Sequence, residues 1–385
     1  MEATSRRALP DLPRSNEHDA GKATYDLETA LAGAKVVVTG GAGLIGSRIT
    51  ARLRSLGAKP VALCTLDAYP REVYEGLFGI EVGGPHLVIG DVTDSALVRE
   101  IVADCDFLIH AAALADVAAC TRQPSSAIST NVLGTQSVLD AVAGAADRVQ
   151  RTVFVSSASV YGHGCEPQTP EARAFHSALE AVYGPLPPVF DEQVTPLDPV
   201  SAYANTKAWG EAQTALTLDA VGVSHSTVRY FSVYGEPQVV KPRSHSWVVA
   251  WFATRAALGL PLELNGGGRQ VRDFVHVDDV AEATVRALVA PDAHRATFNV
   301  GTGIPTSIRE VAELVRQHFP ETVVRETPMP PGDPMGGFAA VKRMRQVLKW
   351  RPEVCVADGV DRYAQWIKET PAAIPTWLRE SAAAS

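Results

Sequence analysis

Cysteine is scarce in the sequence, and no two cysteines form a C-x-x-C pair. The five residues are Cys64, Cys105, Cys120, Cys165 and Cys355. Their odd number and scattered positions argue against a zinc or redox site, and free thiols suit a reducing compartment, so we expect a cytoplasmic protein. The spacing of His163, Cys165 and His176 matches no standard metal site, and we therefore expect no metal ion.

Long apolar runs are also missing. No stretch of about 18 apolar residues occurs, so the sequence predicts no transmembrane helix and no membrane partner. The N-terminal segment carries charges and prolines where a secretory signal would be apolar. We expect residues 1–34 to form a mobile tail.

An excess of positive charge is absent as well. The chain has 35 Lys and Arg against 43 Asp and Glu, a formal net charge of −8. It therefore lacks the basic field that attracts a phosphate backbone, and we expect no nucleic-acid partner. Hydrophobic residues make up 46% of the 385 residues and charged residues 20%, which is typical of a globular protein with a sizeable core.

Short β-branched runs alternate with amphipathic segments through the first two thirds of the chain. We expect strands at residues 35–39, 60–64, 86–90, 106–113, 152–157 and 225–231. Most are separated by segments with helical spacing, such as residues 94–105 and 131–145. Continuously apolar strands that alternate with helices indicate a parallel sheet covered on both faces. The expected fold is a doubly wound α/β sheet of the Rossmann type, followed by a smaller C-terminal α/β lobe.

The stretch TGGAGLIGS lies between an expected strand and an expected helix. It places Gly40, Gly43 and Gly46 three residues apart, and a G-x-G-x-x-G pattern is present too. Glycine is needed where a backbone turns sharply beside a pyrophosphate that lies at a helix N-terminus. This context predicts a dinucleotide site that includes Leu44 and Ile45. A plain strand-to-helix turn is the alternative.

The acid that usually holds the adenosine ribose of NAD is displaced in this sequence. The usual position falls on Cys64, and the nearest acid is Asp67. No arginine follows the strand directly to accept the 2′-phosphate of NADP, since Arg71 is several residues away. The sequence therefore favours NAD.

The stretch YANTK places Tyr203 and Lys207 four residues apart, on one face of an expected helix. A lysine ammonium beside a phenol favours the phenolate, which lowers the pKa of tyrosine and makes it a usable general acid and base. Upstream, VSSASVYG sets three serines at the end of an expected strand, with Ser157 in the middle. The combination predicts a catalytic site.

These motifs, with GDVTD, IHAAAL, NVLGT, RYFSVYG, VRDFVHVDDV and FNVGTG, occur in the order found in one large family. Over residues 35–352 the chain resembles the extended short-chain dehydrogenases/reductases, in the nucleotide-sugar epimerase and dehydratase group. The resemblance implies NAD as cofactor, a nucleotide-diphosphate sugar as substrate and a homodimer.

The resemblance also assigns roles to single residues. It places Asp91 and Val92 beside the adenine and Phe231 near the nicotinamide. Along the cofactor it places Ala111, Ala112, Ala113 and Asn131. For the substrate it implies Arg272 at the diphosphate, Asp333, and Ser232 where an asparagine is common. Tyr203 would take a proton from the sugar C4 hydroxyl while hydride moves to NAD, Lys207 would assist, and Ser157 would hydrogen-bond the same oxygen.

The two residues after Ser157 distinguish the outcomes of the 4-ketose within this group. In 4,6-dehydratases they are typically Asp and Glu, and in glucuronate decarboxylases a glutamate takes the second position; here they are Ala158 and Ser159. The resemblance therefore favours a 4-epimerase, which returns hydride to the opposite face. Dehydratase, decarboxylase, 4-ketoreductase and a dinucleotide-binding sensor without turnover remain alternatives. For Ser156 and Ser159 we expect only turn hydrogen bonds.

The expected domain division follows from these segments. Residues 35–235 form the dinucleotide-binding domain and residues 270–300 return to it. The nucleotide-sugar-binding lobe comprises residues 236–269 and 301–370, and residues 371–385 form a C-terminal tail. A long insertion at residues 163–189 is either a wall or lid of the sugar site or a surface excursion.

Overall fold

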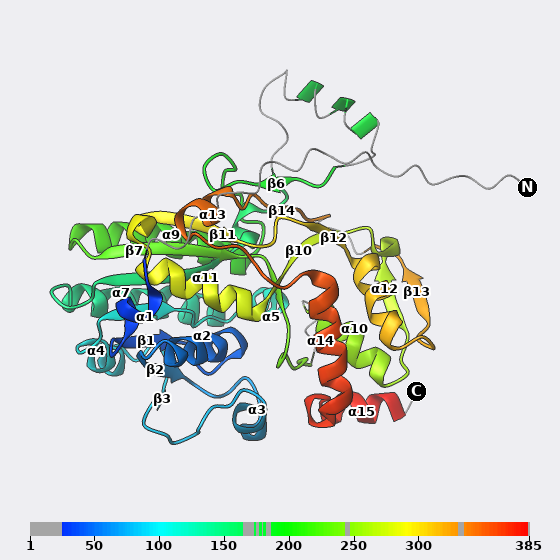
Figure 1. The fold of residues 1–385 in the computed structure, drawn as a ribbon, viewed down its shortest axis with the longest axis horizontal. Coiled ribbons are helices and arrows are strands. Elements are labelled where there is room, and N and C mark those ends of the chain that lie inside the picture. Colours follow the sequence, from blue (N-terminus) through cyan, green and yellow to red (C-terminus); the bar gives the residue numbers. More distant parts are fainter. Residues whose placement is uncertain are drawn as a thin grey trace, which may run out of the picture.

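A seven-stranded parallel sheet forms the centre of the molecule (Figure 1). The computed structural model describes residues 25–164, 186–242, 247–329 and 335–383, with residues 173, 174, 177, 178, 180 and 181. In sheet order the strands are β11 (Ala296–Val300), β7 (Ser224–Tyr230), β5 (Arg151–Ser157), β4 (Phe107–His110), β1 (Lys35–Thr39), β2 (Lys59–Cys64) and β3 (Leu87–Ile89). All neighbours pair in parallel, which confirms the expected doubly wound fold.

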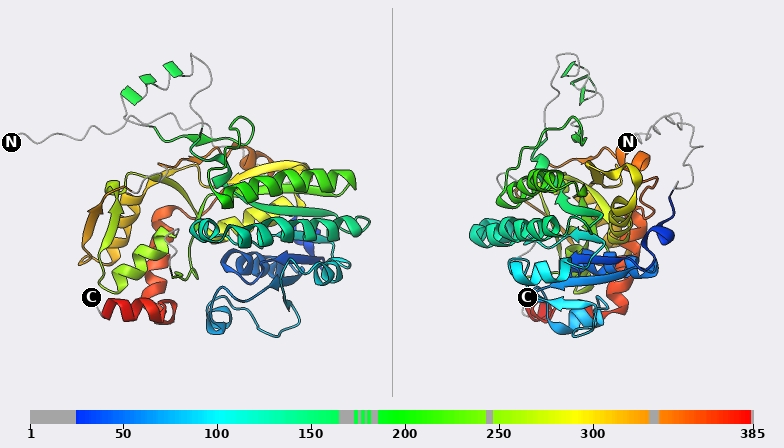
Figure 2. Two further views of the ribbon diagram at one scale, coloured as in Figure 1. Left: turned by 180° about the vertical axis from the view of Figure 1, so that it is seen from behind. Right: turned by 90° about the vertical axis from the view of Figure 1, so that its left-hand side faces the viewer.

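Helices cover both faces of this sheet because its strands are apolar on both sides. Val36 and Val38 of β1 pack with α2 (Leu44–Ser55) and α11 (Val277–Val289) in one core, and Val37 packs in a second core on the opposite face. The helices of that second face are α4 (Ser95–Val102), α7 (Gly134–Gly144) and α9 (Ala202–Ala220). The long helices α7 and α9 lie side by side there (Figure 2, left).

Shorter elements sit near the carboxyl ends of the strands. They are α3 (Arg71–Gly76), α5 (Val117–Arg122), α6 (Pro124–Ile128), the π-helix η1 (Ser129–Leu133) and the 3₁₀ turn η2 (Ala158–Tyr161). Parallel strands in a doubly wound sheet bind ligands at this edge, so these elements surround the place where a site is expected.

The C-terminal part builds a lobe with its own apolar core, at the right of Figure 1. Its helices are α10 (Val248–Ala257), α12 (Ile308–His318), α14 (Val356–Glu369) and α15 (Thr376–Ala383). Its strands are β8 (Ser232–Tyr234), β10 (Val271–His276) and β12 (Pro305–Ser307), with the pair of β9 (Leu262–Asn265) and β13 (Val324–Thr327). A separate pair, β6 (Val189–Phe190) with β14 (Phe338–Ala339), lies next to η2, where Phe190 packs with Tyr161. The helix α13 (Lys342–Val347) and the turns η3 (Gly266–Gly268), η4 (Pro291–Ala293) and η5 (Pro371–Ala373) complete the described elements.

The structure differs from the expected tails at both ends. Residues 27–31 form a helix, α1 (Leu27–Leu31), with Leu27 and Leu31 buried in the main core. At the other end, Leu378 of α15 is buried in the C-terminal core. Both segments carry apolar residues at helical spacing, which the sequence interpretation overlooked. Residues 1–24 lie outside the described part.

The expected return of residues 270–300 to the main sheet is only partly found. α11 packs on that sheet and β11 is its edge strand. β10, however, pairs with β8 and β12 in a separate three-stranded sheet. Its neighbours therefore belong to the segment that links the two parts of the molecule.

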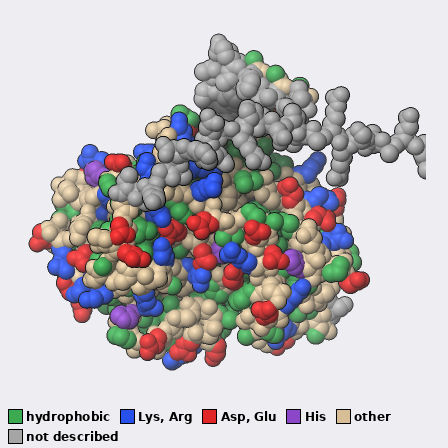
Figure 3. All heavy atoms as spheres, in the orientation of Figure 1, with side chains coloured by type: hydrophobic (Ala, Val, Ile, Leu, Met, Phe, Trp, Pro, Cys, Tyr) green, Lys and Arg blue, Asp and Glu red, His purple; other side chains and the backbone are tan. Residues whose placement is uncertain are grey.

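The surface carries mixed charges. On the face shown in Figure 3, basic and acidic side chains are interspersed, without a large patch of one sign. None of the helices within the described ranges has the length and apolar character needed to span a lipid bilayer.

Candidate functional site

The glycine turn lies where β1 passes into α2. Gly40 has φ +70°, and a Cβ there would come within 2.9 Å of the Ala112 backbone. A Cβ on Gly46 would come within 2.1 Å of the Gly40 carbonyl oxygen. Glycine at these two positions therefore allows the turn to close and the helix to approach the strand.

Gly43 differs from the other two glycines because it faces open space. Its backbone is the N-cap of α2, no side chain caps the helix, and the nearest atom to an added Cβ is the Gly40 carbonyl oxygen at 3.4 Å. The N–H groups of the first turn, at Leu44 and Ile45, lie at the positive end of the helix. This cradle fits the diphosphate of a dinucleotide.

The residues expected to contact the ribose and the adenine come later in the chain than this turn. In the structure, the two aspartates among them accept hydrogen bonds from neighbouring threonines. Asp67 accepts a hydrogen bond from the Thr65 hydroxyl (2.7 Å), and Asp91 accepts two from Thr93 (2.8 Å each). Val92 is buried against Gly134. Cys64 ends β2, and burial raises the pKa of its thiol, so it presents a neutral group at the usual acidic position.

The loop after β4 runs along the glycine turn, as expected for Ala111, Ala112 and Ala113. The N–H of Ala111 donates to the Thr39 carbonyl (3.1 Å), and the N–H of Ala112 donates to the Thr39 hydroxyl (3.2 Å). These bonds place the loop beside the C-terminal end of β1.

Asn131 holds the same loop from the other side. Its amide oxygen accepts from the Leu114 N–H (2.7 Å), and its amide nitrogen donates to the Leu114 carbonyl and to the Thr206 hydroxyl (3.1 Å each). The side chain projects from the π-helix η1, a rare element that often occurs at functional sites. Asn131 therefore ties the loop to α9.

Tyr203 and Ser157 come together at the end of β5. Tyr203 lies in the first turn of α9, which Ser201 caps, and 9% of it is exposed. Burial raises the pKa of Tyr203 to about 12, and the hydrogen bond with Ser157 opposes this shift. The sequence prediction that these two residues meet is consistent with this hydrogen bond.

Lys207 lies one turn further along α9 and is 3% exposed. Its Nζ donates to the Val155 carbonyl of β5 (2.8 Å) and lies 5.2 Å from the centre of the Phe154 ring. Burial lowers the pKa of Lys207 to about 8, while the charge of Glu211 raises it. We expected Lys207 to lower the pKa of Tyr203; instead burial dominates, and the raised pKa corrects that expectation.

The structure contains a buried polar network around Glu211 that the sequence did not predict. Arg229 of β7 donates to both carboxylate oxygens of Glu211 (2.9 and 2.6 Å), and their side chains are 7% and 9% exposed. Arg229 also donates to the Tyr161 hydroxyl (2.7 Å), which donates to Asn299 (2.7 Å). The Ser156 hydroxyl donates to Glu211 (2.5 Å). Glu211 thus joins α9 directly to β5 and β7.

This network changes the interpretation of the serine-rich stretch. Ser156 bonds to a side chain 55 residues away, so the expectation of a turn bond is wrong for it. Only the backbone N–H of Ser159 makes a turn bond, to the Ser157 hydroxyl (3.2 Å). The Ser159 hydroxyl is buried and has no hydrogen-bond partner among the described residues, so the expected turn bond is not found for its side chain. The spacing of Tyr203, Lys207 and Glu211, four residues apart each time, was the available signal for the third residue.

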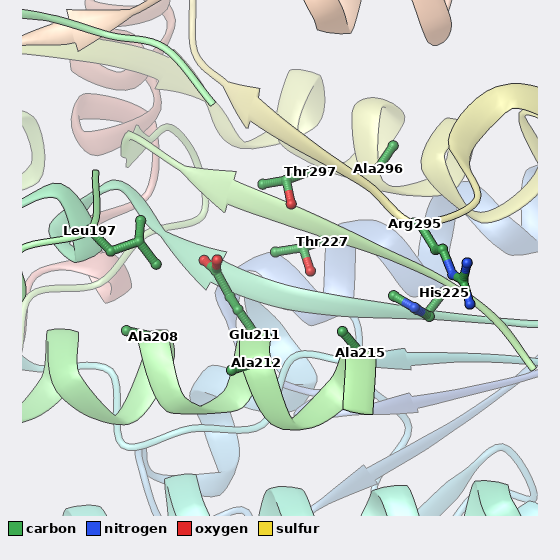
Figure 4. Close-up of a pocket in the computed structure, with 10 residues that line it drawn as sticks. All are labelled: Leu197, Ala208, Glu211, Ala212, Ala215, His225, Thr227, Arg295, Ala296 and Thr297. Atoms are coloured by element: carbon green, nitrogen blue, oxygen red, sulfur yellow. The ribbon is translucent and has the colours of Figure 1, made fainter. Parts of the chain in front are cut away.

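A cavity of about 280 Å³ lies behind this network. Glu211, His225, Thr227, Arg295 and Thr297 are among its lining residues, from α9 and the outer strands of the sheet (Figure 4). Neither the glycine turn nor Tyr203 lines this cavity. It therefore lies apart from the catalytic constellation, with Glu211 between the two.

Phe231, expected near the nicotinamide, and the expected substrate residues Ser232 and Arg272 lie toward the C-terminal lobe. Phe231 donates its N–H to Val300 (3.1 Å), and its ring packs 6.2 Å from Phe190. Ser232 begins β8 and Arg272 lies on the neighbouring β10. Asp333 lies outside the described residues. Within the described ranges no group of three His, Cys, Asp or Glu residues could hold a metal; Cys165, His176 and most of the 163–189 insertion are not among them.

The chain is similar in sequence and in fold to known nucleotide-sugar epimerases. The model of the NAD dependent epimerase/dehydratase family matches residues 36–301. The chain is 28% identical to dTDP-L-rhamnose 4-epimerase from Burkholderia thailandensis over 352 residues, which cover 88% of this chain and 96% of that protein. It is 29% identical to UDP-glucose 4-epimerase from Mycolicibacterium smegmatis, over 87% of this chain and 98% of that protein. The crystal structure of Thermus thermophilus UDP-glucose 4-epimerase in complex with NAD superposes with a TM-score of 0.72 at 29% identity, covering 87% of this chain and 99% of that one.

Proposed function

The chain belongs to the NAD dependent epimerase/dehydratase family, and we propose that it interconverts nucleotide sugars that differ in configuration at C4. Its cofactor is NAD. The observation that supports the proposal is the joint placement of Ser157, Tyr203 and Lys207 at the end of β5, on the same edge of the parallel sheet as the glycine turn. Ala158 and Ser159 follow Ser157 in place of carboxylates.

The proposed chemistry uses the groups at the end of β5. Tyr203 in its phenolate form accepts the proton of the sugar C4 hydroxyl, and Ser157 donates a hydrogen bond to the same oxygen. NAD, held at the glycine turn, would supply the hydride acceptor for C4 and the hydride donor for the return step. In the structure, burial outweighs any effect of Lys207 on the pKa of Tyr203. We propose that the Lys207 ammonium offsets part of this burial effect and so favours the phenolate. Tyr203 gives the proton back when the sugar is reduced from its other face.

The residues after Ser157 favour epimerisation among the reactions of a 4-ketose. Elimination of water across C5 and C6 requires a base and an acid at the sugar. Ala158 has no titratable group and Ser159 has a hydroxyl of high pKa, so neither supplies them. An epimerase needs no further acid or base, because Tyr203 and the cofactor serve both half-reactions.

Exposed apolar side chains on α6, η1 and α9, beside α7, support a homodimer. Leu133 at the end of η1 is 59% exposed, Leu216 of α9 is 70% exposed and Ile128 of α6 is 51% exposed. Exposed apolar side chains on neighbouring helices are typical of an interface between copies of one chain. We propose a homodimer through these helices. We also propose a cytoplasmic location, supported by the unpaired thiols of the described cysteines.

NMR of product mixtures tests the proposed reaction. Purified protein is incubated with UDP-, dTDP- and GDP-hexoses and with UDP-glucuronate, and the sugar signals are followed in time. We expect one sugar to reach the same mixture with its C4 epimer from either direction. A stable 6-deoxy-4-keto product would identify a dehydratase instead, and loss of carbon dioxide a decarboxylase.

The variant Tyr203→Phe separates catalysis from folding in this assay. We expect turnover to fall about 100- to 10,000-fold, because the proton acceptor is lost, while bound NAD is retained. Tyr25→Phe is the matched control, since the Tyr25 hydroxyl bonds to the Leu348 carbonyl (3.0 Å) away from the site. Product from no substrate, with NAD bound equally by all three proteins, would favour a sensor without turnover.

A further inference from the structure

Lys241 lies where the C-terminal part of the chain crosses the end of the main sheet. It follows β8, and its Nζ lies 4.3 Å from the centre of the Tyr69 ring and 5.7 Å from that of Trp247. The Tyr69 hydroxyl donates to the Val239 carbonyl (3.4 Å), which ties the segment after β2 to the segment that carries Lys241. Two aromatic faces therefore hold the ammonium in place.

The ammonium has no ionic partner in direct contact. Among the described residues no carboxylate forms an ion pair with Lys241, and aromatic rings remove water without neutralising the charge. Burial lowers its pKa, and the more distant charges of Asp116 and Asp67 oppose that shift. A partly buried cation without a salt bridge is costly unless an anion completes its surroundings.

The neighbours of Lys241 show where in the fold its charge lies. Asp116 caps α5 after the β4 loop, whereas Asp67 and Cys64 lie at the end of β2. All three act on Lys241 electrostatically. In the sheet, β1 lies between β4 and β2. The position of the ammonium follows from Tyr69, whose ring lies against Lys241 and also packs with Ala42 and Leu44 of the glycine turn in one apolar cluster. The ammonium therefore lies near the end of β1.

We propose that Lys241 binds the diphosphate of the dinucleotide cofactor, opposite the glycine turn and the N-terminus of α2. The inference rests on the NAD site of the proposed function. Lys241 lies outside the expected dinucleotide-binding domain of residues 35–235. The cofactor would therefore be held between the main sheet and the segment after β8. Lys241 also supplies a cation where Cys64 is neutral and Asp67 bonds to Thr65.

Ligand titration of the Lys241→Met variant tests this contact. The full chain is freed of nucleotide, and binding of NAD, ADP and adenosine is measured by calorimetry. We expect the Kd of NAD and of ADP to rise about 10- to 100-fold, since a charge-assisted contact is lost, and the weak binding of adenosine to stay unchanged. Lys241→Arg keeps the cation and should keep most of the ADP affinity.

The control is Lys59→Met, which removes an exposed lysine from the opposite end of β2. Thermal unfolding verifies that each variant is folded, and Lys241→Gln replaces the methionine variant if that one is unstable. An unchanged Kd of ADP in both neutral variants would overturn the inference while leaving the proposed function intact. Weaker binding of UDP alone, to the NAD-loaded protein, would assign Lys241 to the substrate and overturn it too. Failure of the wild type to bind NAD or ADP would overturn both proposals.

Discussion

Tyr203 and Lys207 are both buried, and burial favours the uncharged form of each side chain. Burial raises the pKa of Tyr203 to about 12 and lowers that of Lys207 to about 8. The Lys207 ammonium donates a hydrogen bond to the Val155 carbonyl and not to the Tyr203 phenol. The catalytic form therefore depends on groups that keep Lys207 charged, and Glu211 is the first of these.

Glu211→Gln tests this dependence through the pH profile. Glu211 raises the pKa of Lys207, so removing its charge should lower that pKa below about 8. Lys207 supports the phenolate only when protonated, and it loses its proton as the pH rises through its pKa. The alkaline limit of kcat should therefore move to lower pH, measured by initial rates between about pH 6 and 10.

The control for this prediction is Glu326→Gln, which removes a carboxylate from an exposed ion pair with Arg309. Its pH profile should match that of the wild type. Because Arg229 loses its buried partner in Glu211→Gln, the free energy of unfolding is measured as well. A folded variant with an unmoved alkaline limit would show that Glu211 has only a structural role.

In the turn between β1 and α2, Gly46 is needed for close packing, whereas Gly43 leaves room for a ligand. Gly46→Ala forces a Cβ to 2.1 Å from the Gly40 carbonyl oxygen, so α2 must shift, and we expect a loss of about 1–3 kcal/mol in the free energy of unfolding. Gly43→Ala meets nothing closer than 3.4 Å and has φ −72°, which alanine adopts. Its stability should change by less than about 0.5 kcal/mol.

NAD affinity distinguishes the two variants further. The Gly43→Ala methyl group enters the open cradle at the N-terminus of α2, so we expect the Kd of NAD to rise at least about tenfold in a folded protein. Calorimetry and chemical denaturation provide the two measurements. Normal NAD binding by Gly43→Ala would show that the diphosphate does not approach this turn.

Most elements of the main sheet were predictable from sequence because strands such as β1 and β4 are continuous apolar runs. β1 begins and ends at Lys35 and Thr39 as expected, and Tyr203 and Lys207 lie one turn apart on α9. The polar network was not predictable, since Arg229 lies 18 residues from Glu211 and on another element. Such partners become visible only when strand order is known.

The position of β10 illustrates the same limit for whole elements. Residues 270–300 were expected to return to the main sheet, yet β10 in this segment pairs with β8 and β12. The hydrophobic pattern of a strand indicates whether its two faces are buried, but it does not indicate which strand or helix packs against each face. Lys241 was missed for a related reason, because its aromatic partners Tyr69 and Trp247 come from distant parts of the chain.

The whole molecule leaves apolar side chains of α6, η1 and α9 exposed next to α7. The helices α7 and α9 lie side by side on the face of the sheet away from α2 and α11 (Figure 2), and α9 carries Tyr203 on its inner side. Gln213 of α9 bonds to Gln136 of α7 (2.8 Å), which fixes their spacing. A second copy packed here would stiffen the helix that holds the catalytic residues.

Light scattering of the double variant Leu133→Glu with Leu216→Glu tests this interface. The wild type should have twice the 41.0 kDa mass of one chain, and the variant should be monomeric, because each copy would bury unpaired carboxylates in the interface. Val323→Glu is the matched control, since Val323 is 57% exposed in the C-terminal lobe and should leave the dimer intact. A wild-type mass of one chain, or a dimer that survives both charges, would contradict this assembly and place any contact between copies elsewhere.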